Sequence, residues 1–376
     1  MKNREVLAVF LVSLLIFLLF WRFNLAKNPQ KLDIFVGVDA AYDGVEDIKR
    51  LVDEVRSYTN LFVIGSTGVT FNITKLDEVC QYVCDRGLFF MVYSHPTDQL
   101  NQTRWIEGAR QRWGDRFLGL YVYDEAGGHQ IDRSDYMLVE EADNYTDAAN
   151  KYVGLLARMT EYYMHMGDFP LFTADYALYW FDYEAGYDVV LAEFGWNHSR
   201  LLNVGLCRGA ATLRNKNWGV MITWTYYNPP YIESGEELYN DLILAYQSGA
   251  RYIVVFNYPK VSTYGILEEE HLEALKKFWH YINHNPRVID TMSDRVAYVL
   301  PEDYGYGFRG PADKIWGLWE ADELSNRTWN DANALSENYG LKMDIIYEDY
   351  VKYNGASAYH KFVFWNGTMF TIDNNR

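Results

Sequence analysis

The sequence predicts an α/β fold, a (β/α)8 barrel, because one pattern recurs from residue 33 to residue 286. A short run rich in β-branched and aromatic residues is followed each time by a segment long enough for a helix, and eight such runs occur. Hydrophobic residues make up 49% of the 376 residues, which is enough for one large core. A doubly wound open sheet is the alternative, but no glycine-rich dinucleotide-binding motif follows the first run.

Each predicted strand ends in polar or small residues, as barrel strands do where they meet the loops. The eight strands cover residues 33–40, 60–67, 87–95, 117–125, 169–176, 188–196, 218–227 and 251–259. The segments between them carry apolar residues at helical spacing. The clearest predicted helices cover residues 45–58, 73–87, 146–167, 235–250 and 267–286.

Residues 286–376 are predicted to form a second, small α/β domain. Its expected elements are three strands and one helix, at residues 295–301, 343–349, 360–367 and 329–340. The segment 302–322 is rich in glycine and aromatic residues and is expected to reach over the barrel mouth. The predicted domains are a membrane anchor with its linker, the barrel and this small domain, at residues 1–28, 29–285 and 286–376.

The N-terminal residues predict a membrane-anchor helix. The apolar run 6–21 would span roughly 24 Å as a helix, slightly short of a full span and long for the core of a signal peptide. An uncleaved signal anchor is the prediction, and a cleaved signal peptide that leaves a secreted protein is the alternative. N-glycosylation sequons favour a chain body outside the cell, and they begin at Asn72, Asn101, Asn144, Asn197, Asn326 and Asn366.

The composition narrows the class of partner. The formal net charge is −17, so the surface should repel nucleic acid and anionic lipid, and neutral or cationic partners fit better. Aromatic residues make up 17% of the chain, a share that could serve packing, sugar-stacking surfaces or both. The expected partners are therefore an oligosaccharide or polysaccharide and, through the N-terminal helix, a membrane.

Polar residues at the carboxyl ends of the predicted strands are the candidate site residues, because the active sites of such barrels lie there. They are Asp39, Ser66, His95, Asp124, Glu125, Asp175, Glu193, Trp224 and Asn257. In the fourth strand, Leu118 and Val122 belong to an aliphatic face that should pack on the helices, which directs Glu125 inward. A carboxylate facing the helices would be costly, so Glu193 of the sixth strand is also expected to point inward.

Glu125 and Glu193 are predicted to form a catalytic pair. They come from alternate strands, whose inward side chains share a layer of the barrel interior. Such a pair fits glycoside hydrolysis, in which one carboxyl protonates the leaving oxygen and the other attacks the anomeric carbon or activates water. Asp124 is expected to orient Glu125 or to cap the loop. The alternative is that Asp124 and Glu125 only end a strand and solvate the following turn.

Aromatic and polar side chains around this pair are predicted to bind sugar, with rings stacking on the sugar faces and carboxylates and amides holding the hydroxyls. The predicted substrate-binding residues are Asp39, His95, Asp175, Trp196, Trp224, Tyr226, Asn257 and Tyr258. The histidines show no metal-ligand spacing, and neither a phosphate loop nor a serine-hydrolase elbow occurs. No metal and no cofactor are therefore predicted.

The strand-four end "YVYDEAGG", residues 121–128, is similar to the ends of that strand in several (β/α)8 glycoside hydrolase families. Carboxylates on strands four and six resemble the arrangement of the α-galactosidase-like clan and of polygalactosaminidase-like hydrolases. The resemblance implies a barrel fold and the hydrolysis of glycosides, and no particular sugar. Another large clan carries its nucleophile on strand seven, where this chain has Trp224.

The sequence therefore predicts a membrane-anchored glycosidase that faces outward and cleaves cell-surface or extracellular glycans, with retention preferred over inversion. The alternative from another class is a catalytically inactive barrel that binds glycans at the cell envelope. A structural protein that docks a partner is a third hypothesis, which a large apolar patch in place of an acidic cleft would favour.

Overall fold

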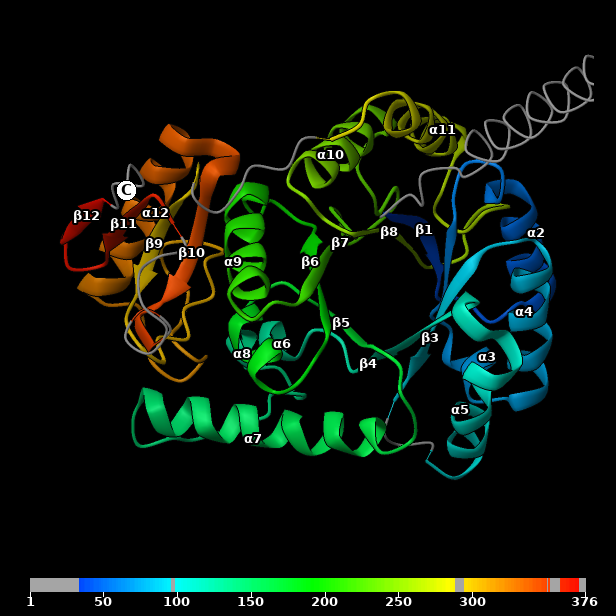
Figure 1. Cartoon of the computed structure of the whole chain (residues 1–376), viewed down its shortest axis with the longest axis horizontal. Coiled ribbons are helices and arrows are strands. Elements are labelled where there is room, and N and C mark those ends of the chain that lie inside the picture. Colours follow the sequence, from blue (N-terminus) through cyan, green and yellow to red (C-terminus); the bar gives the residue numbers. More distant parts are fainter. Residues whose placement is uncertain (1–33, 96–98, 288–293, 350, 352–358, 372–376) are drawn as a thin grey trace, which may run out of the picture. The chain divides into compact units, whose positions relative to one another are not determined.

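The computed structural model describes residues 34–95, 99–287, 294–349, 351 and 359–371 (Figure 1). The predicted anchor helix lies outside these residues. Within the described part of the chain, no helix is both long enough and apolar enough to cross a membrane. From Val36 onward the chain groups into one compact unit, which holds both a barrel and a C-terminal sheet.

Eight parallel strands close into a barrel in chain order, which confirms the predicted barrel (Figure 1). The strands are β1 (Phe35–Ala40), β2 (Leu61–Ile64), β3 (Phe89–Ser94), β4 (Phe117–Val122), β5 (Leu171–Asp175), β6 (Val189–Phe194), β7 (Asn217–Ile222) and β8 (Tyr252–Asn257). Their residues are almost all buried, because helices cover the outer face of the barrel and packed side chains fill its interior.

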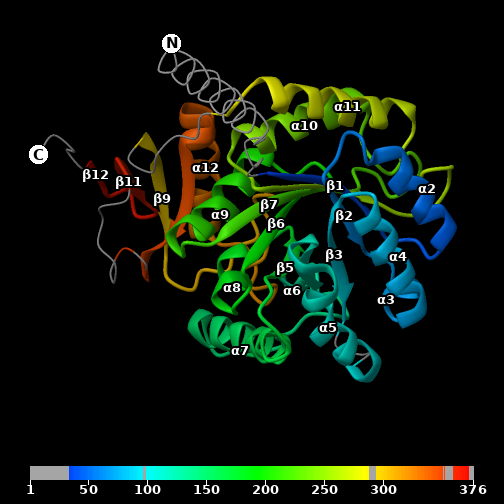
Figure 2. The same ribbon diagram turned by 45° about the vertical axis from the view of Figure 1, so that its right-hand side comes forward.

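Helices connect successive strands on the outside of the barrel, and α10 and α11 lie side by side there (Figure 2). The helices are α2 (Val45–Val55), α3 (Thr67–Thr70), α4 (Ile73–Asp85), α5 (Gln99–Trp113), α6 (Ala126–Asp132), α7 (Tyr145–Met164), α8 (Tyr179–Glu184), α9 (Arg200–Leu213), α10 (Gly235–Gln247) and α11 (Glu269–His284). The five predicted helices correspond to α2, α4, α7, α10 and α11. The short helices α3, α6 and α8 have too few turns to show apolar periodicity in a sequence.

Aromatic side chains fill much of the barrel interior. The rings of Phe172 and Tyr252 lie 5.0 Å apart between centroids, and those of Tyr93 and Tyr121 lie 5.4 Å apart. The barrel is therefore a packed core, and the carboxyl ends of its strands are the face where side chains can meet a ligand.

The C-terminal part of the chain forms a four-stranded sheet in the order β10-β9-β11-β12. Its elements are β9 (Val296–Leu300), α12 (Glu323–Tyr339), β10 (Met343–Tyr347), β11 (Lys361–Phe364) and β12 (Met369–Thr371). The three predicted strands and the helix are present, but α12 begins six residues earlier than predicted, at an Asp322 cap, and β12 was not predicted. The predicted domain boundaries stay a prediction.

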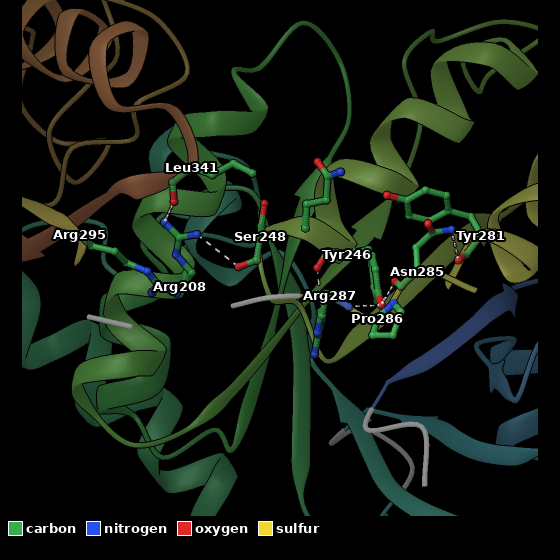
Figure 3. Close-up of a pocket in the computed structure, with 10 residues that line it drawn as sticks. Arg208, Tyr246, Ser248, Tyr281, Asn285, Pro286, Arg287, Arg295 and Leu341 are labelled. Atoms are coloured by element: carbon green, nitrogen blue, oxygen red, sulfur yellow. Dashed lines mark hydrogen bonds between the residues drawn. The ribbon is translucent and has the colours of Figure 1, made fainter. Parts of the chain in front are cut away.

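Helix α9 joins this sheet to the barrel, because it packs against β6 on one side and β10 on the other (Figure 1). Arg208 of α9 is only 3% exposed, and its Nε donates to the fully buried Asp344 of β10 at 2.7 Å. The guanidinium also donates to the carbonyl oxygens of Ser248 and Leu341. A cavity of about 350 Å³ lies beside this arginine (Figure 3).

Candidate functional site

The side chains of Glu125 and Glu193 meet at the carboxyl ends of β4 and β6. Glu193 is the penultimate residue of β6 and is only 4% exposed. Glu125 follows the last residue of β4 by three positions. Each carboxyl group shifts the pKa of the other, so the two members of the predicted pair lie close together.

The backbone turn after β4, and not the alternation of side chains along a strand, directs Glu125 into the mouth. Strand β4 ends at Val122, and both Tyr123 and Glu125 adopt left-handed backbone conformations, with φ of 45° and 58°. Such values are uncommon outside glycine and cost on the order of 1–3 kcal/mol each. The Glu125 N–H donates to the carbonyl oxygen of Ala174 at 2.8 Å, which ties this turn to β5. The predicted strand therefore ended too late, and a strained turn, rather than the pleat, aims Glu125 at the site.

Asp175 at the end of β5 fixes the start of helix α6. Its carboxylate accepts the backbone N–H groups of Gly127 at 2.6 Å and Gly128 at 2.8 Å. The N–H groups of Tyr176 and Ala177 donate to the same carboxylate. A Cβ at Gly127 would overlap the carbonyl of Ala177, and one at Gly128 would overlap the ring of Tyr176. Asp175 was predicted to bind substrate, but these contacts describe a residue that positions the turn carrying Glu125.

Burial makes the two glutamates hold at least one proton at neutral pH. Desolvation is the main cause that raises the pKa of Glu125 to about 8, and the nearby Asp124 and Asp175 add to it. Desolvation and the neighbouring Glu125 raise the pKa of Glu193 well above its usual range. Because the two groups interact, they titrate as a pair. A pair that shares protons in this way can present one acid and one carboxylate to a substrate.

Asp124 and Asp39 bring two more carboxyl groups to the mouth. The hydroxyls of Tyr93 and Tyr121 donate to Asp124 at 3.4 and 3.1 Å. Asp39, at the carboxyl end of β1, is buried, and desolvation together with Asp124 raises its pKa well above the usual range. Its Oδ1 has no hydrogen-bond partner in the structure. Burial therefore favours the neutral form of the Asp39 carboxyl, which can donate a hydrogen bond.

A cavity of about 510 Å³ opens beside Glu125. It is lined by Glu125, Asp132, Tyr176, Trp196, Asn197, His198, Tyr227 and Arg309. Arg309 belongs to the segment 302–322, so this segment reaches the mouth as predicted. Its guanidinium pairs with Asp132 at 2.5 Å and with Asp313 at 2.7 Å. Tyr176 also donates its hydroxyl to Asp132 at 2.8 Å, which makes this wall of the cavity rigid and polar.

Aromatic side chains form the rim on the β6 to β8 side. The rings of Trp196 and Tyr227 lie 4.3 Å apart, and Tyr227 is 79% exposed. The ring of Trp224 is parallel to that of Tyr258 within 11°, at 6.2 Å, and its Nε1 donates to the Tyr258 carbonyl at 2.6 Å. Tyr226 and Tyr258 are also exposed. The rim therefore offers flat, solvent-facing rings held by their neighbours.

Asn257 and His95 complete the predicted site residues. Asn257 is buried, donates to the carbonyl of Tyr264 at 3.1 Å and accepts the N–H of Ile266 at 2.8 Å. These contacts hold the loop after β8, a structural role that the strand-end position did not indicate. His95 follows β3 with its ring 5.8 Å from that of Tyr123, and burial lowers its pKa.

Sequence reasoning missed several residues that line or adjoin the site, namely His129, Asp132, Tyr176 and Arg309. From the sequence, His129 is interpreted only as a loop or mouth residue, although its spacing of four from Glu125 is the spacing of neighbours on one face of a helix. The other three come together only through the tertiary fold, and no local pattern signals them. In the residues that the structure describes, no group of three or more His, Cys, Asp or Glu side chains is arranged to hold a metal ion.

Comparison with known proteins shows the fold. No protein-family model matches the chain, and no curated protein matches it. A β-galactosidase from the psychrophilic Marinomonas ef1 superposes with a TM-score of 0.58 at 11% identity, over 88% of this chain and 72% of that one. GH5_18 from Streptomyces cattleya, in complex with GlcNAc, superposes with a TM-score of 0.55 at 10% identity, over 89% and 99%. At such identities the likeness concerns the barrel fold, and the resemblance to the α-galactosidase-like clan stays a prediction.

Proposed function

We propose that the chain is a glycoside hydrolase whose catalytic carboxyl groups are Glu125 and Glu193. The observation that carries this proposal is that the buried Glu193 and the half-buried Glu125 lie close enough at the carboxyl ends of β6 and β4 to shift each other's pKa, beside an open cavity. Burying two carboxyl groups together costs free energy that a purely structural site would avoid. The likeness in fold to a β-galactosidase and to GH5_18 supports the proposal.

The reaction needs one acid and one nucleophile or base. The protonated glutamate gives its proton to the glycosidic oxygen, which leaves with the electrons of the broken C–O bond. The other glutamate attacks the anomeric carbon, and water activated by the first residue then releases the sugar. Retention is preferred because carboxyl groups that lie close together suit its separation of about 5–5.5 Å, whereas inversion needs about 6.5–9.5 Å. The roles of Glu125 and Glu193 are interchangeable in this proposal.

The proposed substrate is an uncharged or cationic oligosaccharide or polysaccharide. Asp39 and Asp124 would meet its hydroxyl or amino groups, and the exposed rings of Tyr226, Tyr227 and Tyr258 would stack on its sugars. An anionic sugar would have to enter a mouth crowded with carboxyl groups, which disfavours it.

We place this activity outside the cell on an N-terminal anchor. The apolar run at residues 6–21 supports the anchor. Five sequon asparagines in the described part of the chain, at 72, 144, 197, 326 and 366, are exposed, as N-glycosylation requires. Secretion after cleavage is the alternative location.

Two substitutions test the activity. Glu125→Gln and Glu193→Gln keep the shape of the side chain but remove its acid and nucleophile, so each should lower hydrolysis at least ~10³-fold. The wild-type chain is first assayed on 4-nitrophenyl glycosides and on neutral and amino-sugar polysaccharides. Proton NMR of the first-formed anomer then reports retention or inversion on any substrate that is cleaved.

Binding separates the enzyme from a catalytically inactive glycan-binding barrel. The ligand for calorimetric titration is an oligosaccharide that the wild-type chain either cleaves or binds without cleavage. Its affinity should be similar for the wild-type chain and for both glutamine variants. Glu161→Gln, an exposed change on α7, is the matched control and should leave hydrolysis unchanged. Full turnover in both site variants would sink the enzyme proposal, and glycan binding without turnover in the wild-type chain would support the inactive barrel.

A further inference from the structure

His129 is a titratable side chain that contacts Glu125 and has no part in the proposed reaction so far. It lies on α6 four residues after Glu125, and its Nε2 is 3.4 Å from Glu125 Oε2. The backbone N–H of His129 donates to the carbonyl of Glu125 at 2.8 Å, so the same helical turn sets both ends of the contact. The two side chains are held together by the turn that Asp175 anchors.

The imidazole is partly exposed: 26% of the His129 side chain and 36% of the Glu125 side chain are accessible to solvent. Its ring packs on Tyr136, with centroids 5.4 Å apart, and Tyr136 is 67% exposed. On the opposite side Glu125 meets Glu193, which is buried. The cavity beside Glu125 is the other opening to water, and a bound glycan would fill it. His129 is then the polar group through which the carboxyl pair can still exchange protons with solvent.

The charges around His129 are carboxylates. Glu125 touches it, and Asp124 and Asp132 act on it from the β4 turn and from the end of α6. Tyr136 contributes only its ring. Burial outweighs these carboxylates and lowers the pKa of the imidazole, while the pKa of Glu125 is raised to about 8. A neutral imidazole beside a protonated carboxyl can accept a hydrogen bond from it and can take its proton.

We infer that His129 is a positioning residue for Glu125, holding its carboxyl against Glu193 and carrying protons between Glu125 and solvent while substrate fills the cavity. The inference rests on the proposed function of Glu125. In the proposed cycle Glu125 regains from attacking water the proton that it gave to the leaving oxygen, so exchange through His129 carries no net proton. In this exchange the carboxyl gives a proton to Nε2 and the imidazolium releases it to solvent, and the reverse steps restore the protonated carboxyl. One O–H bond breaks and one N–H bond forms, so no further reactant is needed.

Histidine NMR tests the contact without any substrate. The full-length chain, labelled with ¹³C-histidine and held in detergent micelles, is titrated from pH 5 to pH 10. The His129 resonance, assigned by its loss in His129→Gln, should show a titration step near pH 8 that reports Glu125. The step should vanish in Glu125→Gln. A His129 curve that is the same in both chains overturns the inference, even if both chains bind glycan normally.

Kinetics test the role. His129→Gln keeps a hydrogen-bonding amide but cannot titrate, and we expect at least a fivefold loss in kcat, a smaller change in KM and a displaced alkaline limb of the pH profile. His165→Gln, an exposed histidine after α7, should match the wild-type chain. A wild-type rate and pH profile in His129→Gln overturns the role. Absence of turnover in the wild-type chain would instead fault the proposed function, and the NMR step would still decide the contact.

Discussion

The residues that surround Gly127 and Gly128 leave space only for glycine at these two positions. The carboxylate of Asp175 needs both backbone N–H groups at short range, and the segment from Tyr176 to Ala177 leaves no space for a Cβ at either position. The two glycines therefore serve the placement of Glu125, the proposed catalytic side chain. It gives no flexibility to the loop, since α6 begins there.

Gly127→Ala should lower both stability and activity. The added methyl would push the start of α6 away from the Ala177 carbonyl, at a cost of roughly 1–3 kcal/mol, and would displace Glu125. Thermal unfolding and the rate of glycoside hydrolysis measure the two effects. Gly154→Ala on α7 is the control, because nothing lies within 4 Å of its Cβ position, and it should stabilise the chain by about 0.5–1 kcal/mol. Equal melting temperatures for the two variants would contradict this account.

The glutamate pair could be predicted from the sequence, whereas the roles of its neighbours could not. Strand-end positions and the chemistry of two carboxyls were enough to select Glu125 and Glu193. The same positions also selected Asp175 and Asn257, which the fold uses to bind backbone groups of nearby loops. Whether a polar side chain at a strand end faces a ligand or a loop depends on the path of the next loop, and no residue pattern encodes that path.

Helix α9 is the element on which the C-terminal sheet depends. Its Gly209 lies so close to β10 that an added Cβ would be 2.5 Å from the Ile345 carbonyl oxygen. Beside this contact, Arg208 and Asp344 form an ion pair that is buried on both sides. A buried pair adds little net stability over a well-packed apolar pair, but loss of one partner leaves a charge without compensation.

Arg208→Met should destabilise the chain by at most about 3–5 kcal/mol, because the buried Asp344 would lose one of its two cations and keep Arg295, at 3.3 Å. Urea unfolding followed by far-ultraviolet circular dichroism measures the loss. The control is Arg50→Gln, which breaks an exposed pair with Asp47 and should cost less than about 1 kcal/mol. A similar midpoint for both single variants would show that the buried pair is not needed.

Elements with strong patterns were predicted well, and short or late ones were not. The eight strands and five long helices carry apolar runs that sequence periodicity detects. The end of β1 was placed correctly, and the ends of the other strands were placed one to five residues late, as in β4 and β7, because polar and aromatic residues beyond the strand extend the pattern without extending the ladder. β12, a strand of three residues, is paired by its neighbour β11 and has too little sequence of its own to be seen.

Four carboxyl groups at the mouth or next to it have pKa values above their ordinary range. Burial raises the pKa values of Asp39, Glu125 and Glu193, and it raises that of Asp175 to about 7. The folded chain therefore binds more protons than the unfolded chain between about pH 4 and pH 8. His198, whose pKa burial lowers to about 4, works in the opposite direction below pH 6.5.

The chain should lose stability as pH rises from about 6.5 to about 8, where the folded chain still binds more protons than the unfolded chain. Stability from a group with a raised pKa is complete below its unfolded value and is lost as pH passes its folded value. Asp175, fully buried, contributes about 1.4 kcal/mol for each unit of its shift. Scanning calorimetry across this range should show a falling melting temperature. Glu193→Gln, which mimics the protonated side chain, should flatten the fall, and a melting temperature that climbs above pH 7 would refute the assignment.

The segment 302–322 gives the barrel a wall that its own strands do not supply. A designer who trimmed the chain after residue 285 would keep the whole eight-stranded scaffold and both glutamates, yet would remove Arg309 and expose Asp132 to water without its cation. Swapping the terminal portion between homologues would, for the same reason, replace one side of the cavity beside Glu125. The choice of ligand could then change in evolution through the segment 302–322, which is far in sequence from Glu125 and Glu193, while these two residues stayed the same.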